Sequence, residues 1–363
     1  MKKVLILANN DVGLYKFRKE LIQNLVKEYE VYVSLPDGEY IPYLKELGCK
    51  FIEISISRRG TNPITDLKLL MSYKRIIGEV KPDVVLTYTI KPNIYGGLAC
   101  KALGIPYISN ITGLGSAVEN GGVLQKITVT LYKLALKEAS CVFFQNEENR
   151  EFFVSRKIVK KNHRLIPGSG VNLTQYSLLD YPGDTKVNFL FIARVMKEKG
   201  IEQYLNAAKY IKDKYPNTIF HILGFCEEAY ESKLEQMQND GYIQYHGMQS
   251  DIRKFHEISH CTIHPTYYPE GMSNVLLESA ACGRAIITTD RSGCKEIVEN
   301  EISGYIVKQQ NDQDLIEKIE KFLSLSFEEK KRMGLAGRKK VENNFDRGIV
   351  VKSYVEEVQK ILK

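Results

Sequence analysis

Residues 3–29 read KVLILANNDVGLYKFRKELIQNLVKEY and contain the strand, loop and helix from which the fold is inferred. The apolar run at 3–8 is typical of a parallel strand that is buried on both faces. After a polar loop that contains Gly13, residues 15–29 repeat apolar side chains with the 3.6-residue period of an amphipathic helix. A buried strand followed by a helix is the building block of doubly wound α/β sheets.

The same unit recurs along the chain. Further strands are predicted at 31–35, 51–56, 83–88, 105–111 and 141–146, with helices at 40–47, 64–79, 94–103 and 122–139. Residues 166–184 interrupt this pattern with two Pro and three Gly, which indicates a linker. A second α/β run follows, with strands at 187–193, 218–224, 243–247, 261–265, 285–289 and 304–308, and helices at 198–213, 227–239, 273–282, 312–324, 327–343 and from 346 onward.

Two α/β runs separated by a linker predict two Rossmann-like, doubly wound domains with a cleft between them. We place the first domain at 1–175, the second at 176–345 and a C-terminal helix at 346–363. A length of 363 residues suits two domains of ordinary size. In such folds ligands bind at the carboxyl ends of the strands, so the loops that follow strands are the expected place for chemistry.

Composition excludes several classes of protein. With 44% hydrophobic and 26% charged residues, the chain is neither disordered nor fibrous. Its seven Cys form an odd set without a CxxC pair, which favours a reducing, cytoplasmic compartment. The short apolar run after the basic N-terminus does not fit a signal peptide, and no stretch approaches the roughly 20 apolar residues of a membrane-spanning helix. We therefore expect any membrane contact to be peripheral.

Positive charge is concentrated in the first half of the chain. Residues 1–180 carry 25 Lys and Arg against 17 Asp and Glu, whereas residues 181–363 carry 26 against 27. On the predicted helix at 122–139, Lys126, Lys133 and Lys137 share one face beside apolar residues, so this helix is a candidate for contact with an anionic bilayer. The alternative is a core helix with a solvated basic face. The charge is moderate and no nucleic-acid-reading motif is present, so nucleic acid is not an expected partner.

Two cations follow the first strand of the second half. Arg194 ends the run FLFIAR, and Lys199 stands five positions later in RVMKEKG, at the start of the next predicted helix. A guanidinium and an ammonium at a strand end, beside a helix N-terminus, suit a diphosphate. Basic loop residues are more often simply solvated, so this pair needs support from elsewhere in the chain.

That support comes from PEGMSNVLLESAACG, residues 269–283. Glu270 lies in the loop after a predicted strand, and Glu278 follows eight positions later in a helix that Ser273 or Asn274 would cap. The amides of Gly271, Met272 and Ser273 are expected to point toward a ligand at the helix N-terminus. A carboxylate at this place can accept hydrogen bonds from sugar hydroxyls. The alternative for Glu278, a surface helix position, is weakened by its small and apolar neighbours.

Arg194 and Lys199, followed by Glu270 and Glu278 within EGMSNVLLESAACGRAIITTDRSGCKEIV, resemble the donor site of family 4 glycosyltransferases, which have the GT-B fold. The likeness covers almost the whole chain, including IPGSGVN as the linker and a last helix that crosses back to the first domain. It implies retaining transfer from a nucleotide-sugar without a bound metal or other cofactor. The first domain would then bind the acceptor and the second the donor.

The resemblance also implies roles for single residues. Arg194 and Lys199 would neutralise the leaving diphosphate, and Glu270 would lie beside the donor sugar. Glu278 would bind the ribose hydroxyls, while Gly271, Met272, Ser273 and Asn274 would line the sugar and phosphate. Gly224 and Met248 would flank the nucleotide, and Gly13 would give a loop of the first domain room near the diphosphate.

One departure from the family concerns histidine. Many relatives carry a His in the first domain, but all six His residues here lie at or after 163, and Thr112 stands in the matching segment ISNITGLGS. Retention by front-face attack needs no enzymic base, because the leaving phosphate oxygen can take the acceptor proton. If the enzyme inverted instead, Asp11 or Glu119 would be the candidate base. The later His residues are assigned to the core or surface rather than to a metal.

Two other motifs are set aside. Asp312 and Asp314 form a DxD, the metal-binding motif of the other major glycosyltransferase fold, but they fall in the first turn of a predicted helix, where capping and the helix dipole explain them. Gly113 and Gly168 each begin a GxG that is too short for a dinucleotide fingerprint, so a dehydrogenase is not favoured.

The first half resembles bacterial enzymes that build capsule, O-antigen or N-glycan precursors, through YKFRKEL at 15–21, RRGTNP at 58–63 and TIKPNIYG at 89–96. The resemblance implies transfer of a hexose or N-acetylhexosamine, UDP-linked, to a polyprenyl-diphosphate-linked saccharide at the inner face of the membrane. Arg18, Arg59, Lys91 and Thr112 are the expected acceptor contacts. The alternatives are a nucleotide-sugar epimerase or hydrolase of the same fold, and a non-catalytic sugar-nucleotide-binding protein.

Overall fold

The computed structural model describes residues 1–56, 62–115, 118 and 121–363, which form two compact units. Unit 1 comprises Met1–Gly170 and Arg347–Lys363, and unit 2 comprises Val171–Asp346. The division falls after 170 and 346, whereas the sequence placed it after 175 and 345. One hydrogen bond accounts for the different boundary. The Val171 amide donates to the Phe345 carbonyl at 2.8 Å and so attaches the linker to unit 2.

Unit 1 is built on a parallel sheet in the order β3-β2-β1-β4-β5-β6-β7. The strands are β1 (Lys3–Leu7), β2 (Glu30–Leu35), β3 (Lys50–Glu53), β4 (Val84–Tyr88), β5 (Tyr107–Ile111), β6 (Cys141–Phe144) and β7 (His163–Leu165). The helices are α1 (Asp11–Leu25), α2 (Ile41–Glu46), α3 (Pro63–Val80), α4 (Gly97–Leu103), α6 (Gly122–Leu136), α7 (Glu147–Ser155) and α14 (Arg347–Leu362). A π-helix, η1 (Pro92–Gly96), leads into α4.

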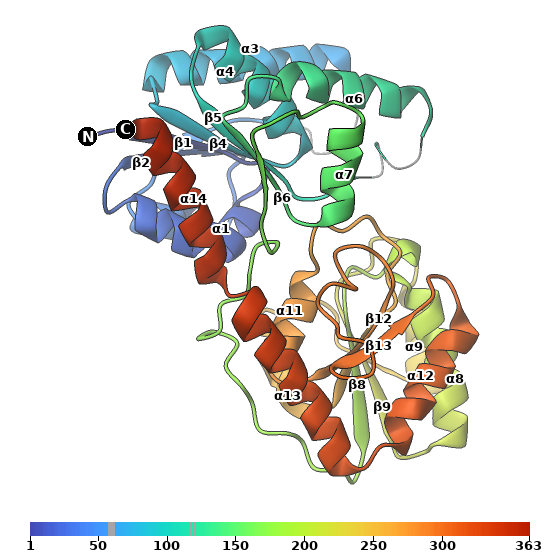
Figure 1. The fold of residues 1–363 in the computed structure, drawn as a ribbon. Helices are drawn as coiled ribbons and strands as arrows, with labels where there is room; N and C mark the ends of the chain where they lie inside the picture. The colour runs from blue at the N-terminus through green and yellow to red at the C-terminus, as the bar shows by residue number, and fades with distance from the viewer. Residues whose placement is uncertain (57–61, 116–117, 119–120) are drawn as a thin grey trace. The chain divides into compact units, whose positions relative to one another are not determined.

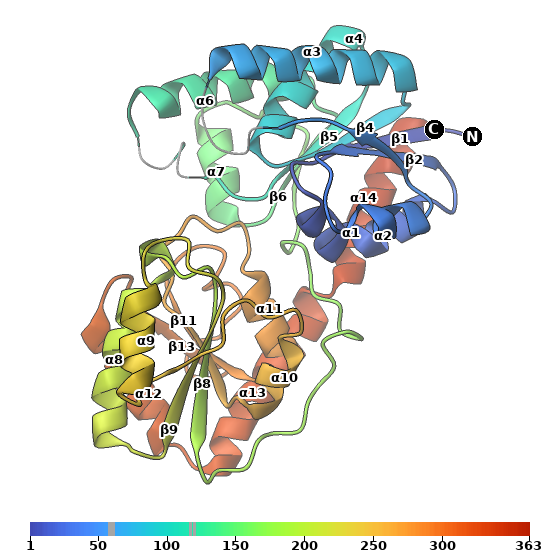
Figure 2. The same ribbon diagram turned by 180° about the vertical axis from the view of Figure 1, so that it is seen from behind.

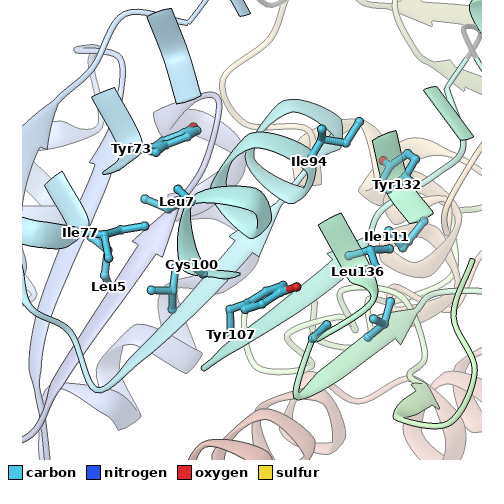
Figure 3. Close-up of a cluster of buried hydrophobic side chains, with 14 of the residues drawn as sticks. Leu5, Leu7, Tyr73, Ile77, Ile94, Cys100, Tyr107, Ile111, Tyr132 and Leu136 are labelled. Carbon is cyan, nitrogen blue, oxygen red and sulfur yellow. The ribbon is translucent and has the colours of Figure 1, made fainter. Parts of the chain in front are cut away.

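Both faces of this sheet are covered, which explains the continuous apolar run at the start of the chain. Side chains alternate along a strand, so Leu5 and Leu7 of β1 pack with α3, α4 and α6, while Val4 and Ile6 pack with α1 and α14. Figures 1 and 2 show these two helical layers on opposite sides of the sheet. Figure 3 shows the first of the two cores, in which Leu7 lies near Tyr73.

Helix α14 is far from α1 in sequence but is bonded to it within unit 1. The Arg347 guanidinium lies 3.0 Å from the Glu20 carboxylate of α1, and it also donates to the Gly170 carbonyl. The Tyr354 ring of α14 packs 4.5 Å from the ring of Phe143, centroid to centroid. These contacts assign the last helix to the first sheet.

Unit 2 repeats the plan with the order β10-β9-β8-β11-β12-β13, again with parallel pairing. Its strands are β8 (Val187–Ile192), β9 (Thr218–Leu223), β10 (Gln244–Tyr245), β11 (Cys261–His264), β12 (Ala285–Thr289) and β13 (Gly304–Val307). Its helices are η2 (Lys197–Lys199, a 3-10 turn), α8 (Ile201–Lys214), α9 (Glu231–Asn239), α10 (Arg253–Ile258), α11 (Asn274–Ala281), α12 (Asp312–Ser324) and α13 (Phe327–Asn344). The predicted pair of Rossmann-like sheets is therefore confirmed.

Three elements were not predicted, namely α7, β7 and α10. Each is short or weakly periodic, which is where sequence patterns are least informative. The first helix also begins four residues earlier than predicted, because the Asn10 side chain accepts a hydrogen bond from the Gly13 amide at 2.6 Å and caps it. Gly13 is therefore in the first turn of α1 rather than in a loop. Among the described residues, no helix combines the length and apolar character that crossing a membrane requires.

The turn between η2 and α8 makes a close backbone contact with the loop after β11. Gly200 has φ +78°, and a Cβ added there would lie 2.1 Å from the Pro265 carbonyl oxygen. The next loop residues continue the contact, since the Tyr267 amide donates to the Glu198 carbonyl at 2.9 Å. Only glycine allows both the left-handed backbone and this approach.

Replacing Gly200 with Ala is expected to lower the free energy of unfolding of unit 2 by at least about 3 kcal/mol, because backbone strain and a backbone clash add together. Gly241→Ala is the matched control, since Gly241 also has positive φ (+81°) but open space around it, and should cost only about 1 kcal/mol. Urea unfolding followed by circular dichroism measures both. Equal losses of stability in the Gly200 and Gly241 variants would contradict the role given to the close contact with Pro265.

Five of the six histidines lie in unit 2 and are held neutral by burial. Burial lowers the pKa of His221, His260 and His264 each to about 4 and that of His256 to about 3, and it also lowers the pKa of His246. In the unfolded chain each has a pKa near the ordinary value of about 6.5. As pH falls below that value, the unfolded state takes up protons that the folded state does not, so stability decreases toward pH 4.

His221, His256, His260 and His264 should each make stability fall by about 1.4 kcal/mol per pH unit between about pH 6 and pH 4. His256→Leu is expected to reduce the slope of stability against pH by the contribution of one histidine, since it removes a fully buried ring with the lowest pKa of the set. Phe220→Leu, a core change without a titrating group, should lower stability at every pH and leave the slope unchanged. A wild-type slope in the His256 variant would refute the assignment.

Candidate functional site

The carboxyl ends of the strands of unit 2 bring together loops that are distant in sequence. Arg194 lies two residues after β8, Gly224 directly follows β9, and Pro265 directly follows β11. The loops are bonded to one another, since the Val195 amide donates to the Phe225 carbonyl at 2.9 Å. The parallel sheet thus places the predicted cations and the loop that carries Glu270 at one edge.

Arg194 is paired with a carboxylate that the sequence analysis did not identify. Its Nη1 donates to the Glu227 carboxylate, and its guanidinium carbon lies 5.2 Å from the centre of the Tyr268 ring. The Arg194 side chain remains about one-third exposed (32%), so it is accessible from solvent.

Lys199 and Glu270 form a partly buried ion pair. The Lys199 Nζ donates to Glu270, and both side chains are largely shielded, at 10% and 17% exposed. Burial raises the pKa of Glu270, but Lys199, His264 and Arg194 together outweigh it, so the pKa lies below its ordinary value. Glu270 is therefore an anion at neutral pH, and the pair that the sequence predicted at one site is brought into contact.

His264 lies at the end of β11 beside this ion pair. Within the described residues, neither of its ring nitrogens has a hydrogen-bond partner, and the side chain is buried. Burial and, to a smaller extent, the charge of Lys199 lower its pKa to about 4, although Glu270 opposes the shift. The ring is neutral at pH 7. His264 was expected in the core or at the surface, and its burial agrees with the core.

Gly224 is fixed by a close backbone approach. Its φ is +138°, and an added Cβ would lie 1.8 Å from the Ala193 carbonyl oxygen. Its amide donates to the Gly247 carbonyl at 2.8 Å, which joins the loops after β9 and β10. Met248, next to Gly247, is 69% exposed at the same edge. Both predicted nucleotide-flanking residues therefore follow strand ends.

The segment before α11 differs in two respects from the prediction. The Ser273 amide donates to the Gly293 carbonyl at 2.8 Å, so it is engaged within the protein rather than directed to a ligand. Ser273 occupies the cap position but makes no side-chain cap. Met272 is buried in the core beneath the helix. The amide of Gly271 was also expected to point toward a ligand. The carbonyl of this residue lies against Gly293.

Asn274 and Glu278 lie four residues apart on α11 and therefore on the same face of the helix. The Asn274 Oδ1 is buried and, in the part of the chain that the structure describes, has no hydrogen-bond partner. Glu278 is 9% exposed, which excludes the surface alternative. A buried acceptor without a partner and a buried carboxylate on one face are suited to hydroxyl or amide donors.

In unit 1 the prediction for Arg18 needs correction. Its side chain is 4% exposed, and its guanidinium lies 5.0 Å from the centre of the Tyr88 ring and 5.9 Å from that of Tyr354. Arg18 thus packs between α1, the end of β4 and α14, and this burial argues against the predicted contact with an acceptor. The sequence could not reveal this, because Tyr354 is 336 positions away from Arg18.

Lys91 follows β4 and is also paired. Its Nζ lies 2.7 Å from Asp66 Oδ1, and the Tyr95 hydroxyl donates to the other oxygen of Asp66 at 2.9 Å. Thr112 directly follows β5 and is half-buried. Both residues are at carboxyl ends of strands of unit 1. Arg59 lies outside the described residues.

Asp11 and Glu119 were the candidate bases for an inverting reaction. Asp11 is buried, and its Oδ2 accepts the Tyr40 amide at 2.8 Å, so it has a structural partner. Glu119 lies outside the described residues. The DxD acids, Asp312 and Asp314, lie in the first turn of α12 as expected, and Asp314 Oδ2 accepts the Lys308 amide at 2.7 Å. The cap itself is Asn311, whose side chain accepts the Asp314 amide at 2.9 Å. Within the described ranges, no three His, Cys, Asp or Glu side chains are grouped so that they could hold a metal ion.

Two residues of the site were missed. Glu227 pairs with Arg194 across 33 positions, and Tyr268 lies against both cations. The position of Glu227, three residues after the predicted strand at 218–224 and at the start of the predicted helix at 227–239, was the available signal. Tyr268 is two residues from Glu270, but no spacing rule connects an aromatic residue there with cations about 70 positions earlier.

Two family models match the chain. Residues 182–340 match glycosyl transferases group 1, and residues 3–146 match the glycosyl transferase 4-like model. Together they cover more than four-fifths of the chain and leave out residues 147–181, with α7, β7 and most of the linker, and residues 341–363, with the last helix. The resemblance that the motifs indicated is confirmed.

Curated relatives align over most of their length. A Campylobacter jejuni N,N'-diacetylbacillosaminyl-diphospho-undecaprenol alpha-1,3-N-acetylgalactosaminyltransferase is 29% identical, over 98% of both chains. A Staphylococcus aureus capsular polysaccharide biosynthesis glycosyltransferase, CapM, is 24% identical over 95% of this chain and 93% of its own. An Escherichia coli UDP-Gal:alpha-D-GlcNAc-diphosphoundecaprenol alpha-1,3-galactosyltransferase is 26% identical over 69% and 68%.

Solved structures share the fold. A glycosyltransferase from Rickettsia africae superimposes with a TM-score of 0.80 at 20% identity, covering 100% of this chain and 99% of its own. HepE from Anabaena, solved in complex with UDP and glucose, gives 0.81 at 16% identity, covering 99% and 100%. Taken with the paired family models and the two parallel sheets, these findings show that the chain belongs to the group 1, family 4-like glycosyltransferases and is an enzyme of the GT-B fold.

Proposed function

We propose that the enzyme transfers a hexose or N-acetylhexosamine, with retention, from a UDP-sugar to a polyprenyl-diphosphate-linked saccharide. The bond from the sugar C1 to the diphosphate oxygen breaks, and a bond from C1 to the acceptor oxygen forms. The proton of the acceptor hydroxyl passes to the departing phosphate oxygen. This scheme requires neither an enzymic base nor a resident metal ion.

The observation that carries this proposal is the pairing of both cations with carboxylates at one edge of unit 2. A donor diphosphate would exchange its own oxygens for those of Glu227 and Glu270 around Arg194 and Lys199. Because negative charge on the leaving diphosphate increases in the transition state, the two cations would stabilise that state more than the ground state. Once displaced from Lys199, Glu270 would be available to accept hydrogen bonds from the donor sugar.

The buried face of α11 is the proposed place for the ribose. Glu278 would accept hydrogen bonds from the ribose hydroxyls, and the Asn274 Oδ1 would accept one more from the donor. Gly224 and Met248 would flank the nucleotide. The Ser273 amide is excluded from this set because Gly293 already accepts its hydrogen bond.

The names of relatives support the acceptor class. Two of them act on sugars linked to undecaprenol diphosphate, and one of these uses UDP-galactose. In unit 1, Lys91 and Thr112 are the described residues that we propose for acceptor contact. Lys91 would exchange Asp66 for a phosphate oxygen, in the same way as the cations of unit 2. The product would enter bacterial surface polysaccharide or glycan synthesis.

Helix α6 is the proposed membrane contact, and the enzyme would act at the inner face of the membrane. Its exposed side combines apolar and basic residues, namely Val123, Ile127 and Leu134 with Lys126, Lys133 and Lys137. Helix α3, which covers the same face of the sheet (Figure 1), exposes Ile64, Leu67 and Met71. Aliphatic side chains beside lysines suit an anionic bilayer.

Lys199→Ala is expected to lower turnover at least a hundredfold, because it removes a cation aimed at the developing charge. Lys209→Ala, an exposed lysine of α8, is the control and should be neutral. Turnover is measured with a panel of UDP-sugars and GDP-mannose and an acceptor from membrane extract. Undiminished turnover in the Lys199 variant would refute the assignment.

The same panel separates the alternatives. Release of free sugar, with no transfer to an acceptor when one is supplied, would identify a hydrolase and contradict the proposed transfer. Absence of nucleotide binding by the wild-type enzyme would contradict every form of the proposal. Proton NMR of the product's anomeric centre tests retention.

Replacing Lys126, Lys133 and Lys137 with Glu is expected to abolish binding to vesicles that contain phosphatidylglycerol, and raised salt should weaken wild-type binding. The charge-matched control replaces Lys209, Arg332 and Lys339, all exposed in unit 2, with Glu. Vesicle co-sedimentation compares the two variants. Equal loss of binding in both would mean that overall charge, rather than α6, governs attachment.

A further inference from the structure

One aromatic ring of unit 2 lies against both cations of the site. The Lys199 Nζ is 4.4 Å from the centre of the Tyr268 ring, and the Arg194 guanidinium carbon is 5.2 Å from it. Both distances are within the range of cation–π attraction. Neither cation shares an element with Tyr268, so the tertiary structure alone creates this arrangement.

The position of Tyr268 is fixed by bonds that do not involve either cation. Its amide donates to the Thr266 Oγ1 at 3.1 Å, and the Thr266 hydroxyl in turn donates to the Glu198 carbonyl at 3.3 Å. The Tyr267 amide donates to the same carbonyl. Glu198 belongs to η2, the turn that carries Lys199, so the ring and the ammonium are anchored to one backbone segment.

The ring differs from the two carboxylates in one physical respect. Glu227 and Glu270 carry the same charge as a diphosphate, so they compete with it for Arg194 and Lys199. The face of a neutral ring attracts a cation through its quadrupole and does not compete for the anion. The ring can therefore stay in contact with both cations while their carboxylate partners are exchanged for phosphate oxygens.

We propose that Tyr268 is a positioning residue, which holds Arg194 and Lys199 together in the geometry that receives the diphosphate of the donor. The ring opposes the mutual repulsion of the two cations at the moment when the carboxylates are displaced. It acts through the cations and needs no contact of its own with the substrate. This inference rests on the proposed function and adds a determinant to the same site.

The test compares Tyr268→Phe, which keeps the ring face, with Tyr268→Leu, which removes it at similar size. Inorganic pyrophosphate and UDP are titrated into the full chain by calorimetry, and kcat and KM are measured with the active UDP-sugar. We expect Tyr268→Leu to weaken pyrophosphate and UDP binding about tenfold to a hundredfold and to lower kcat, with the acceptor KM unchanged. Tyr268→Phe should stay within about threefold of wild type.

Tyr210→Leu is the matched control, because Tyr210 is an exposed tyrosine of α8 that lies near Lys214. It should behave as wild type. Thermal unfolding confirms that each variant is folded, and Tyr268→Met replaces the Leu variant if the latter is unstable. The Met variant has the same expected losses.

Three results would overturn the proposal. Wild-type pyrophosphate binding in a folded Leu or Met variant would show that the ring does not position the cations. Equal losses in the Phe and Leu variants would assign the effect to the hydroxyl group. Failure of the wild-type chain to bind either pyrophosphate or UDP would instead remove the proposed function, and this inference with it.

Discussion

The contact between the Gly200 backbone and the Pro265 carbonyl is the constraint on which the site of unit 2 depends. It joins the turn after β8 to the loop after β11, two segments about 65 positions apart. This approach is possible only without a Cβ. The turn that it holds carries Lys199, which contacts Glu270 and Tyr268 of the opposite loop. The proposed anion site therefore rests on a backbone contact as well as on its charged side chains.

We propose that the ion pairs at this edge of unit 2 serve exchange with an anionic ligand rather than stability. A partly buried ion pair adds little to the free energy of folding, because desolvation offsets much of the attraction. Two such pairs, Arg194 with Glu227 and Lys199 with Glu270, are therefore better explained by the anion that replaces the carboxylates. Lys91 with Asp66 in unit 1 has the same form. In each case we propose that a phosphate oxygen of the substrate replaces the carboxylate partner of the cation.

Patterns in the sequence were reliable where the physical cause is local. Apolar strands that alternate with periodic helices predicted both sheets, and Asp312 and Asp314 lie in the first turn of a helix, as expected. Predictions failed where the partner is remote. Arg18 was expected to contact the acceptor, but it is buried against Tyr88 and Tyr354, and the Ser273 amide donates to the Gly293 carbonyl, twenty positions later. Gly13 was assigned to a loop because the Asn10 cap was not recognised.

The sequence by itself determined the fold class, the family and the positions of Arg194, Lys199, Glu270 and Glu278, because apolar periodicity and motif spacing are properties of short segments. Only the tertiary structure decided which groups these side chains meet. Glu227, Tyr268 and His264 join the site through the parallel sheet, which brings the ends of β8, β9 and β11 to one edge. Contacts of that kind depend on strand order and backbone approach in three dimensions, and no spacing along the chain encodes them.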